Sequence, residues 1–148
     1  MIKINLATEN QIPALVPLFN SYRIFYQQES NEEACNTFLK ERLSKQESII
    51  FIAYENDIAI GFTQLYKTFS SVTLQPYYIL NDLYVSDTHR QKGIATIILN
   101  KAKDFCIEKQ YKGLQLETDV DNPAQKLYEK LGWKRNTDTF HYFWFAPK

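Results

Sequence analysis

The stretch "THRQKGIATIILNKA", residues 88–102, joins a polar, basic turn to an abruptly apolar segment. From residue 94 onward, apolar side chains recur at the three- and four-residue intervals of one helix face. These positions are Ala95, Ile98, Leu99, Ala102, Phe105 and Cys106. The spacing predicts a helix that packs on a sheet, with its first turn fixed at the end of the strand-like run "NDLYV", residues 81–85.

The turn ahead of this helix has the features of an anion-binding site, called the anion seat below. The first turn of any helix presents free backbone N–H groups and the positive end of the helix dipole. Gly93 has no Cβ, so an anion can approach the main chain there, and Arg90 and Lys92 add positive charge. The common phosphate motifs GxxxxGK and GxGxxG are both missing. A pyrophosphate cradle and a plain surface turn both stay open on these residues alone.

The N-terminal third of the chain reads as one strand followed by two helices. Residues 2–6, "IKINL", alternate as a strand does, and Thr8 is placed to cap a helix. Pro17 falls inside that helix and predicts a kink or a break. The run "SNEE", residues 30–33, is typical of a capping box and predicts the start of the second helix at Ser30.

The remainder predicts a hairpin, a central strand and a strand–helix–strand ending. Residues 48–67 form two β-rich runs around the turn "END", and residues 77–85, "YYILNDLYV", are apolar on both faces. After the helix of the opening stretch comes the strand "LQLETD", residues 114–119. A short helix from Pro123 stops at Gly132, and "TFHYFWF", residues 139–145, ends the chain as an aromatic strand.

This order of elements predicts an α/β (α+β) fold in one domain over residues 1–148. The order is β-α-α-β-β-β-α-β-α-β-β, which gives a mixed, mostly antiparallel central sheet of about seven strands flanked by about four helices. Alternation of strand and helix in the second half predicts a parallel pair within that sheet. No repeat or low-complexity linker divides the chain.

Composition excludes several classes of protein. The 17 basic and 17 acidic residues give a formal net charge of +0, which disfavours a general nucleic-acid binder. Cys35 and Cys106 are far apart and have no histidine cluster, so neither a zinc site nor a disulfide framework is indicated. The apolar runs fall short of the about 20 residues of a membrane span, and we expect a cytoplasmic protein.

Two motifs in the expected order resemble the GNAT N-acetyltransferases. Residues 90–95, "RQKGIA", follow the strand "NDLYV" and resemble the family's acetyl-CoA signature, Arg/Gln-x-x-Gly-x-Gly/Ala. Residues 117–133, "ETDVDNPAQKLYEKLGW", resemble its later strand-plus-helix segment. Both look most similar to the polyamine, diamine and histone acetyltransferase group. The resemblance implies a GNAT fold with a splayed parallel pair, and transfer of an acetyl group from acetyl-CoA to an amine without a metal.

The resemblance also implies which residues hold acetyl-CoA. Backbone N–H groups of residues 91–95 would take the pyrophosphate, main chain of residues 83–85 would pair with the pantetheine arm, and Asn122 would hydrogen-bond it. The cofactor-binding residues expected in this way are Leu83, Tyr84, Val85, Arg90, Gln91, Lys92, Gly93, Ile94, Ala95 and Asn122. Asn122 can equally be a turn or cap residue before Pro123.

Three residues are the candidates for catalysis. An amine with a pKa of about 10.4 must lose a proton before it attacks. The candidate base is Asp82 or Glu117. Asp82 can instead be a hydrogen-bonded residue of a strand bulge, and Glu117 a residue of a solvated face. By resemblance, Tyr128 protonates the leaving thiolate; its apolar helical stripe also suits a core tyrosine. His89 and His141 are weaker candidates as bases.

The acceptor is the least specified partner. Glu29, Glu32 and Glu33, together with Asp82, Glu117 and Asp119, would suit a polyamine, diamine or other small cationic amine. Acetylation of a protein lysine or N-terminus, and a non-catalytic acyl-CoA-binding domain, are the alternatives. The aromatic C-terminal run can be a core strand or an interface strand, and we expect a homodimer without nucleic-acid or membrane partners.

Overall fold

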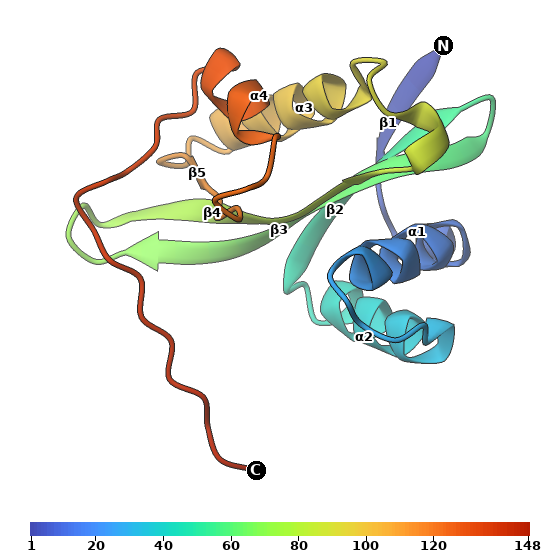
Figure 1. Cartoon of the computed structure of the whole chain (residues 1–148), viewed down its shortest axis with the longest axis horizontal. Helices are drawn as coiled ribbons and strands as arrows, with labels where there is room; N and C mark the ends of the chain where they lie inside the picture. The colour runs from blue at the N-terminus through green and yellow to red at the C-terminus, as the bar shows by residue number, and fades with distance from the viewer. The chain divides into compact units, whose positions relative to one another are not determined.

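The computed structural model describes residues 1–148, which separate into two compact units, Met1–Glu117 and Thr118–Lys148. The first unit holds almost all the regular structure (Figure 1). Its elements are β1 (Ile2–Leu6), the 3-10 helix η1 (Glu9–Gln11), α1 (Ile12–Phe25), α2 (Glu32–Ser44), β2 (Ser48–Glu55), β3 (Ile58–Ser70), β4 (Gln75–Val85), the 3-10 helix η2 (Asp87–His89), α3 (Ile94–Glu108) and β5 (Leu114–Gln115).

The sheet of the first unit is mixed, as the order of elements predicted. Its strands lie in the order β1-β2-β3-β4-β5, with every neighbouring pair antiparallel except β4 and β5, which are parallel. It has five strands rather than about seven. Residues 116–119 and 139–145 form no strand, because β-rich side chains alone do not make one where no backbone partner forms a ladder.

The hairpin between β2 and β3 is confirmed. Its turn consists of Asn56 and Asp57, at φ 51° and 66°, both in the left-handed region. Asn and Asp tolerate that region better than other non-glycine residues, and a two-residue turn of this kind matches the twist of the flanking strands. The local sequence was therefore sufficient to predict this part of the sheet.

Helices cover both faces of the sheet in the first unit. Alternation along β2 directs Ile50 and Ile52 to the face that α1 and α2 cover, whereas Ala53 packs with α3 on the other face. Figure 1 shows α1 beside α2 on one side of the strands and α3 on the other. The helix predicted from the opening stretch is confirmed as α3, which buries Ile98 and Leu99 completely.

The capping residue predicted for α2 is wrong, and the break that was one of two outcomes predicted at Pro17 does not occur. Asn31, not Ser30, caps α2, and its side chain accepts from the N–H of Ala34. The Ser30 hydroxyl instead accepts from Asn20 Nδ2 at 3.0 Å. Pro17 does not break α1, which runs to Phe25. Burial of the helix against the sheet offsets the one backbone hydrogen bond that a proline removes.

The second unit contains one short helix, α4 (Gln125–Lys130). It begins at Gln125, two residues after the predicted start at Pro123, and stops just before Gly132, as predicted, with φ 94° at that glycine. The N–H of Gly132 bonds to Glu129 O, and the N–H of Trp133 bonds to Tyr128 O at 3.0 Å, which is the Schellman pattern of a helix end. Residues 134–148 follow without helix or strand.

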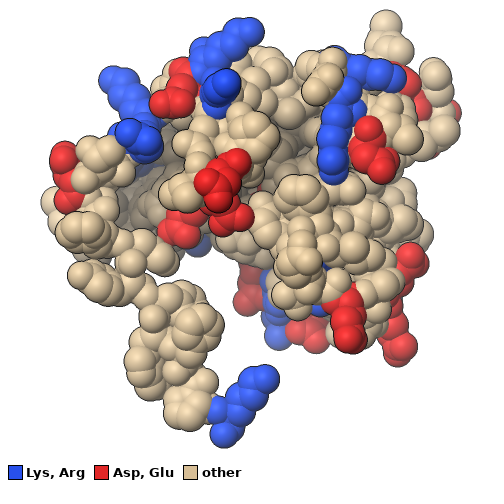
Figure 2. Space-filling model, in the orientation of Figure 1, with Lys and Arg blue, Asp and Glu red and all other residues tan.

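Charge and hydropathy of the folded chain agree with its composition. Figure 2 shows basic and acidic side chains interspersed over the face in view, as expected for a formal net charge of +0. None of the helices combines the length and apolar character that a membrane span requires.

Candidate active site

The turn before α3 has the geometry of an anion seat. Gly93 is the N-terminal cap of α3 at φ 77°, and no side chain caps the helix. A Cβ built on Gly93 would meet no atom within 4 Å, so the space over the main chain is open. Gln91, at φ 62°, also adopts the left-handed conformation. The uncapped N–H groups at this end of α3 therefore fit a pyrophosphate.

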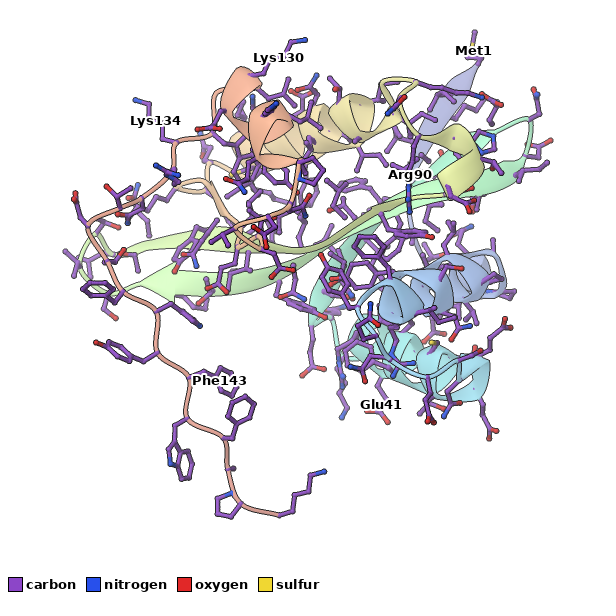
Figure 3. The ribbon with its side chains drawn as sticks, in the orientation of Figure 1. Met1, Glu41, Arg90, Lys130, Lys134 and Phe143 are labelled. Carbon is purple, nitrogen blue, oxygen red and sulfur yellow. The ribbon has the colours of Figure 1, made fainter.

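The Arg90 side chain contacts β4 and α1. Its Nε donates to Val85 O at 3.1 Å, and its guanidinium lies over the rings of Tyr84 and Phe25, at 5.4 and 5.8 Å from their centroids. Figure 3 shows Arg90 between the end of β4 and α1. Arg90 thus fixes the turn against the sheet, while Lys92 on the same turn is exposed.

One edge of β4 is open along the half that precedes the anion seat. β5 pairs with β4 only at Tyr78 and Ile79, so no strand covers residues 80–85 on the side away from β3. Leu83, Tyr84 and Val85 lie in this open half and are partly buried. An extended ligand can add to such an edge as a strand does.

Asp82 is a buried carboxylate at a bulge in β4. The register with β3 shifts beside it, because Asp82 pairs with Gln64 and Leu80 with Leu65, which leaves Asn81 as the extra residue. Bulges of this kind redirect side chains next to functional sites. Asp82 is 3% exposed. Asp82 therefore lies beside a strand bulge, which is close to the alternative that the sequence left open, a hydrogen-bonded bulge residue.

Three polar side chains surround the Asp82 carboxylate. Gln64 Nε2 donates to Oδ2 at 2.5 Å and Asn81 Nδ2 donates to Oδ1 at 2.8 Å. The Tyr22 hydroxyl from α1 also hydrogen-bonds the carboxylate and reaches Asn81 O at 3.3 Å. No lysine or arginine forms an ion pair with Asp82. The negative charge is thus held by neutral dipoles alone.

Burial determines the protonation of this cluster. It raises the pKa of Asp82, and the hydrogen bonds from Asn81, Gln64 and Tyr22 oppose that rise by favouring the carboxylate. Burial and the nearby Asp82 charge also raise the pKa of the Tyr22 and Tyr66 hydroxyls. Both tyrosines therefore stay protonated, and Tyr22 donates to a carboxyl group that can itself accept a proton.

Asp82 lies in the wall of a cavity of about 360 Å³. The cavity is bounded by α1, α2, β3 and β4, all within the first unit. Its lining includes the four aromatic residues Phe19, Tyr22, Phe38 and Tyr66 and the polar residues Arg23, Asn81 and Asp82. A larger hollow of about 520 Å³ is lined by residues of β1, β2 and α3 and contains none of the predicted site residues. The smaller cavity is thus the candidate acceptor pocket.

The other predicted acidic residues lie elsewhere. Glu117 is exposed and follows β5 instead of belonging to it. Glu29, Glu32 and Glu33 are exposed and do not line the cavity. Among the carboxylates that we predicted to receive an amine, only Asp82 lies in the cavity wall.

The two histidines have other surroundings. His89 Nδ1 lies 2.9 Å from the Thr88 hydroxyl, and its Nε2 lies 3.6 Å from Glu55. The second contact joins η2 to the end of β2. His141 is exposed in the segment that follows α4.

The second unit carries Asn122 and Tyr128. The Asn122 side-chain oxygen accepts from the N–H of Ala124 at 2.9 Å and so closes the turn before α4. Tyr128 is partly buried, and its ring lies 6.1 Å from that of Trp133. That ring contact accompanies the Schellman end of α4.

Sequence reasoning missed Tyr22, Arg23, Gln64 and Asn81. Gln64 had a detectable signal, since "TQ" at residues 63–64 interrupts an otherwise apolar strand with two polar side chains that are both completely buried. Tyr22 and Arg23 had none, because their role depends on α1 lying against β4. No group of three or more His, Cys, Asp or Glu side chains is arranged to hold a metal ion.

The first unit thus brings together an uncapped helix start, an open strand edge and a buried carboxylate in a cavity wall. Residues 13–133 match the Acetyltransferase (GNAT) family. The chain therefore belongs to the GNAT acetyltransferase family. It is an N-acetyltransferase that uses acetyl-CoA, as the resemblance of the two motifs implied.

Full-length relatives agree with this assignment. The uncharacterized N-acetyltransferase YhfO of Bacillus subtilis is 45% identical over 99% of both chains. A probable acetyltransferase of Haemophilus influenzae is 36% identical over 86% of this chain and 97% of its own. A crystal structure of a probable acetyltransferase, also 36% identical, has a TM-score of 0.93 over 99% of both chains. The predicted GNAT fold is thereby confirmed.

Proposed function

We propose that this protein acetylates a small primary amine by direct attack in a ternary complex, with Asp82 as the general base. The observation that carries the proposal is the buried Asp82 carboxylate, which lies in a cavity wall without a cationic partner. An acceptor ammonium would supply the missing positive charge. Polyamines and diamines are candidate acceptors, by resemblance to the group that acetylates them.

Asp82 addresses the proton that blocks attack. An amine of this kind has a pKa of about 10.4, so roughly one molecule in 10³ is neutral at pH 7. Deprotonation therefore adds about 4 kcal/mol to the barrier. The raised pKa of Asp82 brings its proton affinity closer to that of the amine. Asp82 first takes one proton from the ammonium, and the neutral nitrogen then bonds to the acetyl carbon. The carbon–sulfur bond breaks, and the leaving sulfur takes a proton from Tyr128. The second proton of the amine nitrogen restores Tyr128, and Asp82 releases its proton to solvent, so each turnover releases one proton.

The residues proposed to hold acetyl-CoA are those predicted from the family motif. The open edge of β4 at residues 83–85 suits the pantetheine arm, and the uncapped start of α3 at residues 91–95 suits the pyrophosphate. Arg90 would act by fixing that turn, given its bond to Val85 O. Asn122 retains its side-chain N–H₂ group for a ligand, since its oxygen closes the turn before α4.

Tyr128→Phe tests the proposed acid. We expect turnover to fall about 10²-fold or more, because a positioned general acid contributes that much, while the acetyl-CoA dissociation constant stays within about twofold. Thiol release and isothermal titration measure the two quantities. Unchanged turnover would show that Tyr128 is not the acid.

A thiol-release screen tests the acceptor class. It includes spermidine, diamines, amino acids, aminoglycosides and lysine peptides, with the acetylated product identified by mass. Turnover of small amines supports the proposal. Turnover of lysine peptides alone would favour a protein acetyltransferase, and acetyl-CoA binding without any turnover would favour a binding domain.

A further inference from the structure

We propose that the preferred acceptor carries an anionic group as well as its amine, as an amino acid or another aminocarboxylate does. This inference rests on the proposed function and narrows its substrate class. It follows from the charges in the cavity lining, where Asp82 and Arg23 are the two charged residues. One site for a cation and one for an anion therefore face the same space.

Neither charge is neutralised within the protein. Arg23 Nη1 donates only to the backbone oxygen of Glu29, at 3.2 Å, and Arg23 forms no ion pair. Asp82 is bonded by neutral groups alone. Arg23 presents up to five N–H donors, so most of its hydrogen-bonding capacity is available to a ligand carboxylate or phosphate.

Much of the remaining cavity lining is aromatic. Phe19 and Phe38 stack with ring centroids 5.8 Å apart, and Tyr22 packs at 6.2 Å from Phe19. Such walls suit the apolar body of a small molecule, and about 360 Å³ lies in the range of small-molecule pockets. The cavity thus fits a compact molecule with opposite charges at two positions.

The same charges disfavour a polyamine. A second ammonium group of spermidine or a diamine would share the cavity with the Arg23 guanidinium, and like charges at close range repel. Glu29, Glu32 and Glu33 do not line the cavity to compensate. Arg23 is therefore a specificity-determining residue that selects against dications.

Matched acceptor pairs test this inference. Each pair has the same amine with and without a carboxylate: lysine against 1,5-diaminopentane, phenylalanine against phenethylamine, and 4-aminobutyrate against propylamine. We expect kcat/KM to be about 10- to 100-fold higher for the carboxylate-bearing member of at least one pair, the range of one charge-assisted hydrogen bond. Equal or reversed preference in all three pairs would overturn the inference.

Arg23→Gln assigns the preference to a residue. We expect it to lower the preference to within about twofold of unity, mainly through a raised KM for the carboxylate-bearing member. Glutamine can still donate to Glu29 O, which limits damage to the fold. Lys40→Gln is the matched control, because it removes the same charge from an exposed site on neighbouring α2. A preference that survives Arg23→Gln would overturn the role of Arg23.

The outcomes separate this inference from the proposed function. Turnover of diamines in preference to aminocarboxylates would leave acetylation of small amines intact and remove only the zwitterionic acceptor. A lack of turnover for every amine, with acetyl-CoA still bound, would remove the proposed function and this inference with it.

Discussion

Asp82 links the stability of the protein to the chemistry proposed for it. The folded state raises the pKa of this carboxyl group above its reference value of 3.8. At a pH between the pKa of Asp82 in the unfolded chain and its pKa in the folded chain, Asp82 is protonated in the folded state and ionised in the unfolded state. The free energy of unfolding therefore falls as pH rises through this range. The stabilising contribution is complete below about pH 4 and is lost as pH rises through the folded pKa.

Asp82→Asn is expected to remove that pH dependence. Asparagine has nearly the same shape as aspartate and does not ionise. The free energy of unfolding of the variant should therefore rise relative to that of the wild type as pH increases from 4 to 8. Urea denaturation at several pH values measures the difference. A difference that is constant over this range would mean that burial does not shift Asp82.

The sequence indicated Asp82 but not its surroundings. A carboxylate in an otherwise apolar strand is visible in one dimension, since burying it requires partners. Gln64 is 18 residues away along the chain, and Tyr22 bonds to Asn81 across 59 residues. Those partners depend on how α1 and β3 pack on β4, which no local pattern encodes. The role of Arg23 could not be predicted from the sequence for the same reason. The acceptor class inferred from it could not be predicted either.

At the scale of elements, the start of α3 determines how an anion is received. In Gly93→Ala, a side chain would be forced into the left-handed region, at roughly 1–2 kcal/mol, and a methyl group would enter the open space over the N–H groups. We expect acetyl-CoA affinity to fall about tenfold, equivalent to 1.4 kcal/mol, as measured by isothermal titration.

Gly113→Ala is the control for this substitution. Gly113 also has open space around it and does not have a positive φ, so alanine should fit without loss of affinity. Equal affinities for the two alanine variants would argue against the start of α3 as the phosphate seat.

Gly61 sets how closely α3 approaches the sheet. A Cβ there would lie 2.9 Å from Tyr84 O and 3.1 Å from Ile98 Cδ1, so either β4 or α3 must shift. We expect Gly61→Ala to lower the free energy of unfolding by about 1–3 kcal/mol, the usual range for overpacking. Chemical denaturation provides the measurement, and a stability equal to that of wild type would show that α3 yields freely.

Elements with local signals were predictable, and elements that need a partner were not. The Asn56–Asp57 turn and the apolar stripe of α3 are encoded within a few residues. Strand β5 is shorter than its β-rich sequence suggested, because it pairs with β4 only at Tyr78 and Ile79. The cap of α2 moved by one residue, since "SN" offers two adjacent capping side chains and Ser30 bonds to Asn20.

At the scale of the whole molecule, the aromatic C-terminal segment lacks a buried environment. Phe140, Tyr142, Phe143, Trp144 and Phe145 are each more than 70% exposed. Aromatic surface of this extent usually marks an interface. We therefore retain the prediction of a homodimer, in which this segment contributes to the contact.

Removal of residues 139–148 tests that prediction. Light scattering should give a dimer for the full chain and a monomer for the shortened one, because the contact would lose its aromatic surface. A monomeric full chain, or a dimer that survives the truncation, would contradict it.

Acetyl transfer at the Asp82 cavity is tested most directly by thiol release from acetyl-CoA in the presence of the amine panel, for the wild type and Asp82→Asn. We predict that the wild type releases thiol in step with an N-acetylated product. The variant should bind acetyl-CoA with unchanged affinity but turn over about 10²-fold more slowly, with the greatest loss at neutral pH. Wild-type turnover by Asp82→Asn, or no product from any amine with the wild type, would contradict the account.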